Sequence, residues 1–447
     1  MKRGHILLFI FAVILVLGVI CALYPKDGIL GLRFPSLSEI IKGEEKDTVP
    51  ALSPEEIMAM RLRAIEEESF RQYALTDPSR FSFPNDSLEY FDALFTALEM
   101  ADSVPVRILH WGDSQLEEDR ITGHIRPALQ EKFGGSGPGR MPFMRHYTYT
   151  MGVGTSVPFE RYSVYGYGIK NETSNYGPFG DFQRIDTTAT FTYYPNPKVD
   201  TADIFNRLTI YLGNVANPVT FKCGGVRQTV EPGELMSKVV FDLPDSTSKV
   251  TVSVSGGPAD CYGALLDNRT GVRMDNIAMR GCSGTVFTKM NREQIAMFCK
   301  EENVRLIIMQ FGGNSVPVLK SSKLGTYMNS IKNQIDMMKQ VAPQAAILFI
   351  GPSDMSTMVA GKRQTYPIIP ELVDSLRSVT NASGAAYWDL YGVMGGYNSM
   401  IEWVNATPPL ARTDYIHFQQ AGSARVSEIF CKTFFKYYNN YYEFRKH

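Results

Sequence analysis

Short apolar runs alternate with segments of helical periodicity in two parts of this chain. The apolar runs cover residues 106–111, 276–279, 304–310, 345–350 and 386–390, and the helix-like segments fall near residues 117–133, 286–300, 321–341, 366–379 and 419–437. In the segment 321–341 the apolar residues recur at the spacing of one helix face. Short apolar strands that alternate with helices predict a parallel sheet covered by helices on both faces.

The stretch between residues 150 and 270 does not follow this alternation. Its apolar runs are short and separated by turn-forming Pro and Gly residues, and they lie at residues 188–194, 207–212, 219–223, 238–243 and 249–254. Strands at this spacing with turn signals between them predict a β-sandwich. The sandwich would be an insertion, because the strand–helix alternation resumes after it.

The N-terminus carries one long apolar run over residues 6–23, preceded by Lys2 and Arg3. A run of this length can span a hydrocarbon core of about 30 Å, and the positive-inside rule keeps its N-terminus in the cytoplasm. No convincing small-x-small cleavage site follows the run, which favours an uncleaved signal anchor over a cleaved signal peptide. The rest of the chain is then extracytoplasmic, and periplasmic in a Gram-negative cell.

These patterns divide the chain into four parts. The expected parts are a transmembrane anchor over residues 1–25, a tether and helical arm over 26–102, an α/β domain split into 103–150 and 271–447, and an inserted β-sandwich over 151–270. Within the arm, Ser53-Pro54-Glu55-Glu56 is a capping box that predicts a helix to about residue 74. A second helix is predicted over residues 87–100.

Composition narrows the class of protein. The 447 residues include 45 Lys and Arg against 46 Asp and Glu, a net charge of -1, which gives no electrostatic footprint for nucleic acid. The six cysteines show no C-x-x-C and no metal-ligand spacing, so no zinc site is expected. Cys223 and Cys261 lie in the β-rich stretch, where a disulfide and two buried thiols are both open readings.

The first candidate for chemistry is Gly112-Asp113-Ser114, directly after the apolar run 106–111. A serine at a strand-to-helix turn lies at the carboxyl edge of a parallel sheet, where α/β enzymes place their sites. The positive end of the following helix favours an anionic intermediate there. The tripeptide alone is a weak signal, because it arises by chance in about one chain in ten of this length.

A serine nucleophile needs a base, most often a histidine. Asp414-Tyr415-Ile416-His417 is the best candidate, because a carboxylate three residues before the imidazole can reach its Nδ1 atom in one loop. Asp414 is equally explained as the N-cap of a helix that starts near His417. The other histidines occupy less suitable positions: His5, His110, His124, His146 and His447.

Two further motifs follow predicted strands. Phe311-Gly312-Gly313-Asn314 comes after the run 304–310, and Gly281-Cys282-Ser283-Gly284 comes after the run 276–279. An Asn amide can donate to a developing oxyanion, and a glycine lets its backbone N–H approach that oxyanion closely. Ordinary turns explain each motif as well.

Taken in order, these motifs resemble the SGNH (GDSL-type) hydrolase superfamily, whose four sequence blocks supply Ser, Gly, Asn and His. The resemblance implies a three-layer α/β/α, flavodoxin-like domain. It implies that Ser114 is the nucleophile, His417 the base and Asp414 the residue that orients the base. It also implies an oxyanion hole made by the Ser114 N–H, Gly284 and Asn314, with Gly281 as the alternative match for the glycine.

Within this superfamily the chain is most similar to the peptidoglycan O-acetylesterase branch of bacterial envelopes, in which a carbohydrate-binding-like β-sandwich is inserted between the Ser and Gly blocks. The phrases at residues 108–115 and 414–418 carry this likeness, which covers roughly residues 104–435. Two positions depart from the pattern. Gln115 stands where Leu or His is usual, and Ser315 stands where an acidic residue is frequent.

The resemblance implies an extracytoplasmic serine esterase, without a cofactor or metal, that removes O-acetyl groups from peptidoglycan or another polysaccharide. One alternative is an O-acyltransferase that uses the same triad beside a membrane acyl-donor protein. Another is a non-catalytic glycan-binding envelope protein. The tyrosines that approach or enter the insertion would either stack on sugar rings or pack between the domains: Tyr162, Tyr165, Tyr167 and Tyr176.

Overall fold

The computed structural model describes residues 3–23, 53–148, 150–166, 168–199, 203–233 and 235–446. The tether expected up to residue 52, Tyr167 and His447 lie outside these residues. The chain divides into two units, Met1–Glu68 and Ser69–His447, which are described separately.

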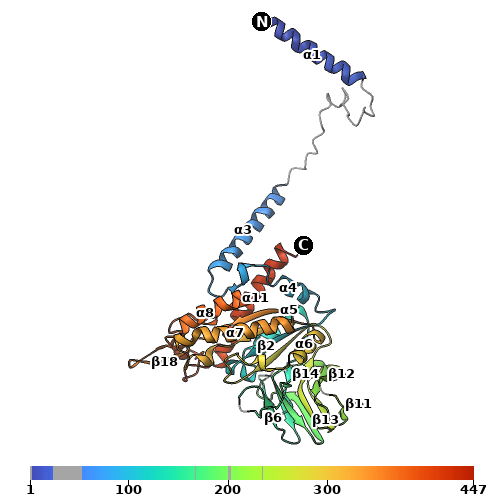
Figure 1. Ribbon diagram of the computed structural model, residues 1–447, viewed down its shortest axis with the longest axis vertical. Coiled ribbons are helices and arrows are strands. Elements are labelled where there is room, and N and C mark those ends of the chain that lie inside the picture. Colours follow the sequence, from blue (N-terminus) through green and yellow to red (C-terminus); the bar gives the residue numbers. More distant parts are fainter. Residues whose placement is uncertain are drawn as a thin grey trace. The chain divides into compact units, whose positions relative to one another are not determined.

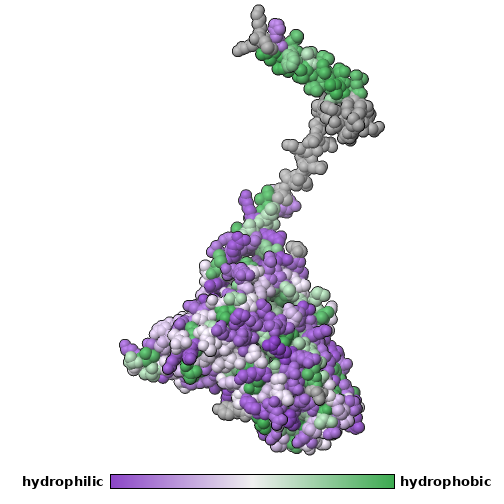
Figure 2. All heavy atoms as spheres, viewed as in Figure 1, coloured by the Kyte–Doolittle hydropathy of each residue, from purple (hydrophilic) through white to green (hydrophobic). Residues whose placement is uncertain are grey.

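The first unit contains α1 (Arg3–Leu23) and the start of α3 (Pro54–Thr76). Helix α1 is hydrophobic along most of its length (Figure 2), and Gly4–Leu23 is long and apolar enough to cross a membrane. A signal sequence near the N-terminus has the same properties. The capping box forms as predicted, because the Ser53 N–H donates to Glu56 Oε2 at 2.7 Å and the Glu56 N–H donates to Ser53 Oγ at 3.2 Å.

The second unit is built on a six-stranded sheet with the strand order β1-β20-β17-β16-β2-β15. The strands from β20 to β15 are parallel, and β1 pairs antiparallel with β20 at the edge. Strand β2 is buried along its whole length, as expected of a strand covered on both faces. The strands are β1 (Phe81–Ser82), β2 (Val106–Gly112), β15 (Val272–Ala278), β16 (Val304–Gln310), β17 (Ala346–Ile350) and β20 (Ala386–Trp388).

Two groups of helices cover the two faces of this sheet (Figure 1). Side chains alternate along β2, so Ile108 packs into one core while Leu109 and Trp111 pack into the other. The first core is shared with α4 (Asp92–Glu99), α5 (Thr122–Phe133) and α11 (Gln420–Phe444), and the second with α6 (Arg292–Glu301), α7 (Ser321–Val341) and α8 (Ile369–Ala382). The predicted three-layer α/β/α fold is confirmed.

Two further sheets form the β-sandwich between α5 and β15. Their strand orders are β11-β10-β13-β8-β5-β4 and β12-β9-β14-β7-β6, and β3 pairs with β14. Their inward side chains form a hydrophobic core of their own. The strands are β3 (Gly139–Met141), β4 (His146–Tyr147), β5 (Met151–Thr155), β6 (Arg161–Ser163), β7 (Asp181–Ile185), β8 (Ala189–Pro195), β9 (Phe205–Gly213), β10 (Val219–Cys223), β11 (Val226–Val230), β12 (Ser237–Thr247), β13 (Val250–Gly256) and β14 (Ala259–Asp267).

Shorter elements connect the layers. They are η1 (Pro84–Asp86), η2 (Ser114–Asp119), η3 (Phe287–Lys289), η4 (Gly313–Ser315), α9 (Leu390–Met394) and α10 (Ser399–Asn405). Strands β18 (Ser356–Val359) and β19 (Lys362–Thr365) form a separate two-stranded sheet, which projects from the domain in Figure 1. Segments this short carry too few residues for a periodic pattern to reveal them.

The sandwich contacts the α/β domain through buried aromatic and charged side chains. The rings of Tyr211 in β9 and Phe298 in α6 lie 5.1 Å apart. Arg107 of β2 is fully buried and forms ion pairs with Asp275 of β15 at 2.8 Å and with Asp267 of β14. Because a buried charge left unpaired is costly, the pair with Asp267 holds the sandwich against the sheet, whereas the pair with Asp275 joins two strands of the sheet itself.

Three details differ from the sequence expectations or decide between them. Residues 81–82, in the expected arm, add strand β1 to the central sheet. The helix predicted over 117–133 is interrupted, because Glu118 and Asp119 have φ angles of 60° and 62°, which a right-handed helix does not contain. All six cysteines are free, so Cys223 and Cys261 are buried thiols.

Candidate active site

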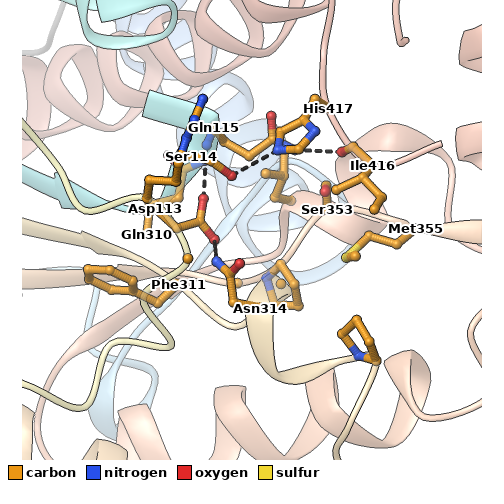
Figure 3. A pocket seen from close by; sticks show the side chains of 17 residues that line it. Asp113, Ser114, Gln115, Gln310, Phe311, Asn314, Ser353, Met355, Ile416 and His417 are labelled. Carbon is orange, nitrogen blue, oxygen red and sulfur yellow. Dashed lines mark hydrogen bonds between the residues drawn. The ribbon is translucent and has the colours of Figure 1, made fainter. Parts of the chain in front are cut away.

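Several loops meet around a cavity of about 310 Å³ at the carboxyl edge of the central sheet (Figure 3). Four of these loops follow β2, β15, β16 and β17, and another precedes α11. The loops that follow strands meet because the carboxyl ends of parallel strands share one edge. Ser114, Asn314 and His417 line the cavity together with Gln310, Phe311, Ser353, Met355 and Ile416.

Two hydrogen bonds link Ser114 to Asp414 through His417. Ser114 Oγ lies 2.9 Å from His417 Nε2, and His417 Nδ1 lies 2.8 Å from Asp414 Oδ2. Burial alone would raise the pKa of Asp414, but the hydrogen bonds from His417 and Ile416 outweigh it and lower that pKa below its ordinary value. An ionised carboxylate therefore faces the imidazole, which is placed to accept the Ser114 proton.

The Asp414 carboxylate caps a turn and does not start a helix. Its Oδ1 atom accepts the N–H groups of Ile416 at 2.9 Å and His417 at 3.0 Å, whereas α11 begins only at Gln420. Tyr415 within this turn has a φ of 60°. The turn thus leaves Oδ2 of the same carboxylate for the imidazole, which a cap at a helix start would not require.

Two side chains that the sequence did not identify as functional hold this arrangement. Gln115 Nε2 donates to the Ile416 carbonyl at 2.7 Å, and Gln115 Oε1 accepts the Phe418 N–H at 3.3 Å. Arg120 Nη2 donates to the Ser114 carbonyl at 2.7 Å. These particular bonds to backbone atoms follow no recognised sequence motif, so only Gln115, as a departure from the family pattern, offered a signal.

Asp113 and Asn314 form a second polar pair beside the cavity (Figure 3). Asn314 Nδ2 donates to Asp113 Oδ2 at 2.9 Å and to the Cys282 carbonyl at 3.1 Å, and the Gln115 N–H donates to Asp113 Oδ1 at 3.0 Å. Burial raises the pKa of Asp113 to about 6, although these bonds oppose the change. The Asn314 amide is therefore held in one orientation, with two protein acceptors.

The two candidate glycines are placed differently. Gly281 lines the cavity, whereas the Gly284 N–H donates to the Cys282 sulfur at 3.3 Å. A Cβ atom on Gly284 would lie 2.7 Å from the Phe311 side chain, and its φ is 78°. Glycine is required at position 284 for steric reasons, and the structure does not bring its N–H together with Ser114 in the cavity lining.

The loop that carries both glycines is anchored at three successive carbonyls. The Tyr165 hydroxyl donates to the Gly281 carbonyl at 2.6 Å, and the Tyr327 hydroxyl donates to the Ser283 carbonyl at 2.7 Å. The bond from Asn314 described above holds the carbonyl between them. Because Tyr165 lies just after β6, the inserted sandwich contacts the wall of this cavity directly.

The tyrosines predicted to meet sugar or the domain interface pack against protein where they are described. Tyr162 stacks on Phe182 with 4.8 Å between the ring centroids. Tyr176 is buried in the core that joins the sandwich to the sheet, and Tyr165 is half-buried. The packing alternative therefore applies to these three side chains.

The remaining titratable groups near the site are unsuited to its chemistry. Burial lowers the pKa of His110 to about 3 and also lowers those of His124 and His146. Burial raises the pKa of the Cys282 thiol to about 11, which keeps it protonated at neutral pH. Among the described residues, no group of three His, Cys, Asp or Glu side chains could hold a metal ion.

Comparison with known proteins gives one family and one similar fold. Residues 245–425 match the GDSL-like Lipase/Acylhydrolase family, a span that includes Asn314, Asp414 and His417 but starts after Ser114. No curated protein sequence matches the chain. A solved structure described as a peptidoglycan O-acetylesterase in action has 18% sequence identity and a TM-score of 0.65, and the alignment covers 78% of this chain and 96% of that chain.

Two other solved structures align with lower scores. A Bacillus subtilis protein has 13% identity and a TM-score of 0.29, with 63% of this chain and 89% of that chain covered. A family two carbohydrate esterase from Cellvibrio japonicus has 9% identity and a TM-score of 0.25, with 65% and 98% covered. Scores this low add nothing to the fold assignment.

The protein therefore has an SGNH-like α/β fold, and its residues 245–425 match the GDSL-like lipase/acylhydrolase family. Its fold is similar to that of a peptidoglycan O-acetylesterase over nearly the whole length of that structure. The resemblance inferred from the sequence motifs is confirmed at the level of superfamily and fold.

Proposed function

We propose that this protein is a serine esterase that removes O-acetyl groups from a cell-envelope polysaccharide, with peptidoglycan as the first candidate. One observation carries the proposal: the hydrogen-bonded series Ser114–His417–Asp414 in the wall of a cavity. A fold alone hosts many activities. A serine hydroxyl bonded to an imidazole that is bonded to an ionised carboxylate is the arrangement that activates a nucleophile.

The proposed reaction has two halves. Ser114 Oγ attacks the acetyl carbonyl while His417 Nε2 takes its proton, and the imidazolium then protonates the sugar oxygen, which leaves as a hydroxyl. A water molecule attacks the acetyl-Ser114 ester while His417 again accepts a proton. The imidazolium then returns that proton to Ser114 Oγ as the ester bond breaks, which releases acetate and restores the serine hydroxyl. Asp414 stays ionised throughout and stabilises the imidazolium.

The proposed oxyanion donors are the Ser114 N–H, the Asn314 amide and a glycine N–H. The cavity lining supports Gly281 as that glycine, although the family pattern favours Gly284. In the structure the Asn314 amide already donates hydrogen bonds to the Asp113 carboxylate and to the Cys282 carbonyl. In this proposal the oxyanion replaces the Cys282 carbonyl, whose bond is the longer of the two, and the amide keeps its bond to Asp113.

The substrate class and location rest on supporting features. The likeness to a solved peptidoglycan O-acetylesterase and the inserted sandwich support a polysaccharide substrate. The apolar helix Gly4–Leu23 supports attachment to a membrane as a signal anchor, with the catalytic domain outside the cytoplasm. The open alternatives are transfer of the acetyl group to another sugar hydroxyl, with a membrane acyl-donor protein as partner, and glycan binding without catalysis.

One experiment tests the proposal against these alternatives. The full chain, purified in detergent, is incubated with O-acetylated peptidoglycan, and separately with a small activated acetate ester plus non-acetylated glycan strands. Acetate release in both arms, lost in Ser114→Ala, is the expected result. Acetylated glycan as the main product of the second arm would indicate a transferase. If neither acetate nor acetylated glycan forms in either arm, the glycan-binding alternative is favoured.

A further inference from the structure

The geometry points to a second binding site beside the catalytic cavity, which holds a neutral, hydroxyl-rich sugar residue of the polysaccharide chain. The inference rests on the proposed function for the identity of its ligand. The site is a cavity of about 230 Å³ between the α/β domain and the sandwich. One wall comes from η2, α5 and the end of β15, and the other from the segment 138–148 and from β6 and β7.

The two cavities are neighbours that share one side chain, Arg280, which lines both. Arg280 Nε lies 2.7 Å from Glu117 Oε1, and its side chain is 71% exposed. Among the described residues, Arg280 is the only one that lines both cavities, and its partner Glu117 lines the second cavity alone. A polymer that presents an acetyl group to Ser114 and runs past Arg280 therefore brings a neighbouring sugar residue into the second cavity.

The backbone of η2 is strained where it forms the wall of this cavity. Glu118 and Asp119 both have positive φ angles, and strain of this kind persists only where the surroundings impose it. Arg126 imposes it here, because its Nη1 and Nη2 atoms donate to the two Asp119 carboxylate oxygens at 2.8 and 3.0 Å, and both side chains are buried. The strained turn directs the exposed Glu118 side chain to the cavity.

Polar groups with unused hydrogen-bonding capacity face the cavity from both walls. Within the described residues, neither Glu118 nor His146 on β4 makes a side-chain hydrogen bond, and both line the cavity. Burial lowers the pKa of His146, so its imidazole is neutral at pH 7 and offers one donor and one acceptor. A sugar hydroxyl, which both donates and accepts, matches such a set of groups.

The charges of the lining favour a neutral ligand over an acidic one. The arginines and carboxylates are equal in number and form ion pairs: Arg126 with Asp119, Arg140 and Arg161 with Asp181, and Arg280 with Glu117, while Glu118 remains. Arg140 and Arg161 share the single charge of Asp181, so the lining is neutral as a whole only because Glu118 adds one further negative charge. A uronate or phosphate group would therefore find no net positive charge and would meet the Glu118 carboxylate. A neutral sugar meets no such penalty and can bond to both kinds of charged group.

The test measures binding and catalysis separately in the full chain. Binding of the N-acetylglucosamine tetramer is measured by calorimetry in a Ser114→Ala background in detergent. Adding Glu118→Asn or Arg161→Ala is expected to weaken binding about tenfold each, since each removes a hydrogen bond to a charged group. Asparagine tolerates the positive φ at position 118, and Asp181 keeps its pair with Arg140 when Arg161 is removed.

The kinetic arm uses the same changes with Ser114 intact. Activity on O-acetylated peptidoglycan (kcat/KM) should fall about tenfold, while hydrolysis of a small acetate ester stays within twofold of the unchanged protein. Glu131→Asn, an exposed carboxylate on α5 outside both cavities, is the matched control and should change neither.

Each outcome is decisive. The inference is overturned by absence of tetramer binding, by equal binding in Glu118→Asn and Arg161→Ala, or by tighter binding of trigalacturonate than of the neutral tetramer. Failure of the proposed function gives a different result: the unchanged protein then binds the tetramer but releases no acetate from peptidoglycan.

Discussion

The substitution Asp113→Asn tests whether the buried Asp113 carboxylate orients the Asn314 amide, the candidate oxyanion donor. The change keeps the shape of the side chain and keeps Oδ1 as acceptor for the Gln115 N–H. It replaces the acceptor Oδ2 by an NH₂ group that faces Asn314 Nδ2, so two donors meet where one hydrogen bond existed. Loss of that bond costs about 1–3 kcal/mol of stability, independent of pH.

The change also removes an ionisation that opposes folding. Burial raises the pKa of Asp113 from 3.8 to about 6, so the folded protein binds the proton more tightly than the unfolded chain does. The resulting loss of stability is absent below about pH 4, grows as the pH rises to about 6 and is constant above that. A pKa difference of about 2.2 corresponds to about 3 kcal/mol.

The free energy of unfolding should therefore change with pH differently in the two proteins. Relative to the unchanged protein, Asp113→Asn should be about 1–3 kcal/mol less stable at pH 4 and should gain about 3 kcal/mol between pH 4 and pH 7. Urea denaturation of the chain from residue 53 onward, at pH steps between 4 and 8, measures this difference. A stability difference that does not change between pH 4 and pH 7 would refute the reasoning.

The same substitution should lower kcat while leaving KM nearly unchanged, because in the proposed mechanism the displaced Asn314 amide acts in the transition state. We expect a loss of about 10²-fold, within the range for one oxyanion donor. The control is the double variant Asp113→Asn/Asn314→Ala. If Asp113 acts through Asn314, the kcat of the double variant is no lower than that of Asn314→Ala alone. If the fold losses of the two single variants multiply in the double variant, Asp113 acts independently of Asn314.

Three further predictions concern other residues around the cavity and the N-terminal part of the chain. Ser114→Ala should lower the rate about 10⁶-fold and Asp414→Asn about 10⁴-fold on a small acetate ester; a near-normal rate in Ser114→Ala would place the nucleophile elsewhere. Tyr165→Phe removes one hydrogen bond to the cavity loop and should lower kcat about three- to tenfold on small ester and polysaccharide alike, whereas loss on polysaccharide alone would indicate a contact with sugar. A chain that starts at residue 53 should remain folded and hydrolyse the small ester as fast as the full chain, which a rate comparison in detergent-free buffer checks.

The local pattern of the sequence was sufficient for most of the α/β domain. Apolar runs bounded by Gly and Pro marked the parallel strands, and the helical spacing over residues 321–341 predicted α7 with the observed bounds. These elements are visible because burial on both faces, or on one helix face, imposes a regular pattern on neighbouring residues. The same reasoning found β8, β10 and β13 in the sandwich.

Other elements depend on partners that are distant in the sequence. Strand β14 is buried along its whole length, yet it contains Asp260 and Asp267. The strand can bury these two side chains because they form ion pairs with Arg184 and Arg107. Strand β1 has only two residues, and it is a strand because β20 offers a free edge. No local pattern encodes either fact, since the cause lies in contacts across the fold.

The candidate site divides in the same way. The sequence by itself named Ser114, Asn314, Asp414 and His417, because each stands in a short motif at the end of a strand or in one loop, where spacing along the chain sets the geometry. Only the tertiary structure decided that Gly281 and not Gly284 lines the cavity, and that Gln115, Arg120 and Tyr165 bond to backbone carbonyls of the loops around the cavity. The physical reason is that a backbone carbonyl can accept a hydrogen bond whatever side chain its residue carries, so such partners leave no trace in the amino-acid sequence.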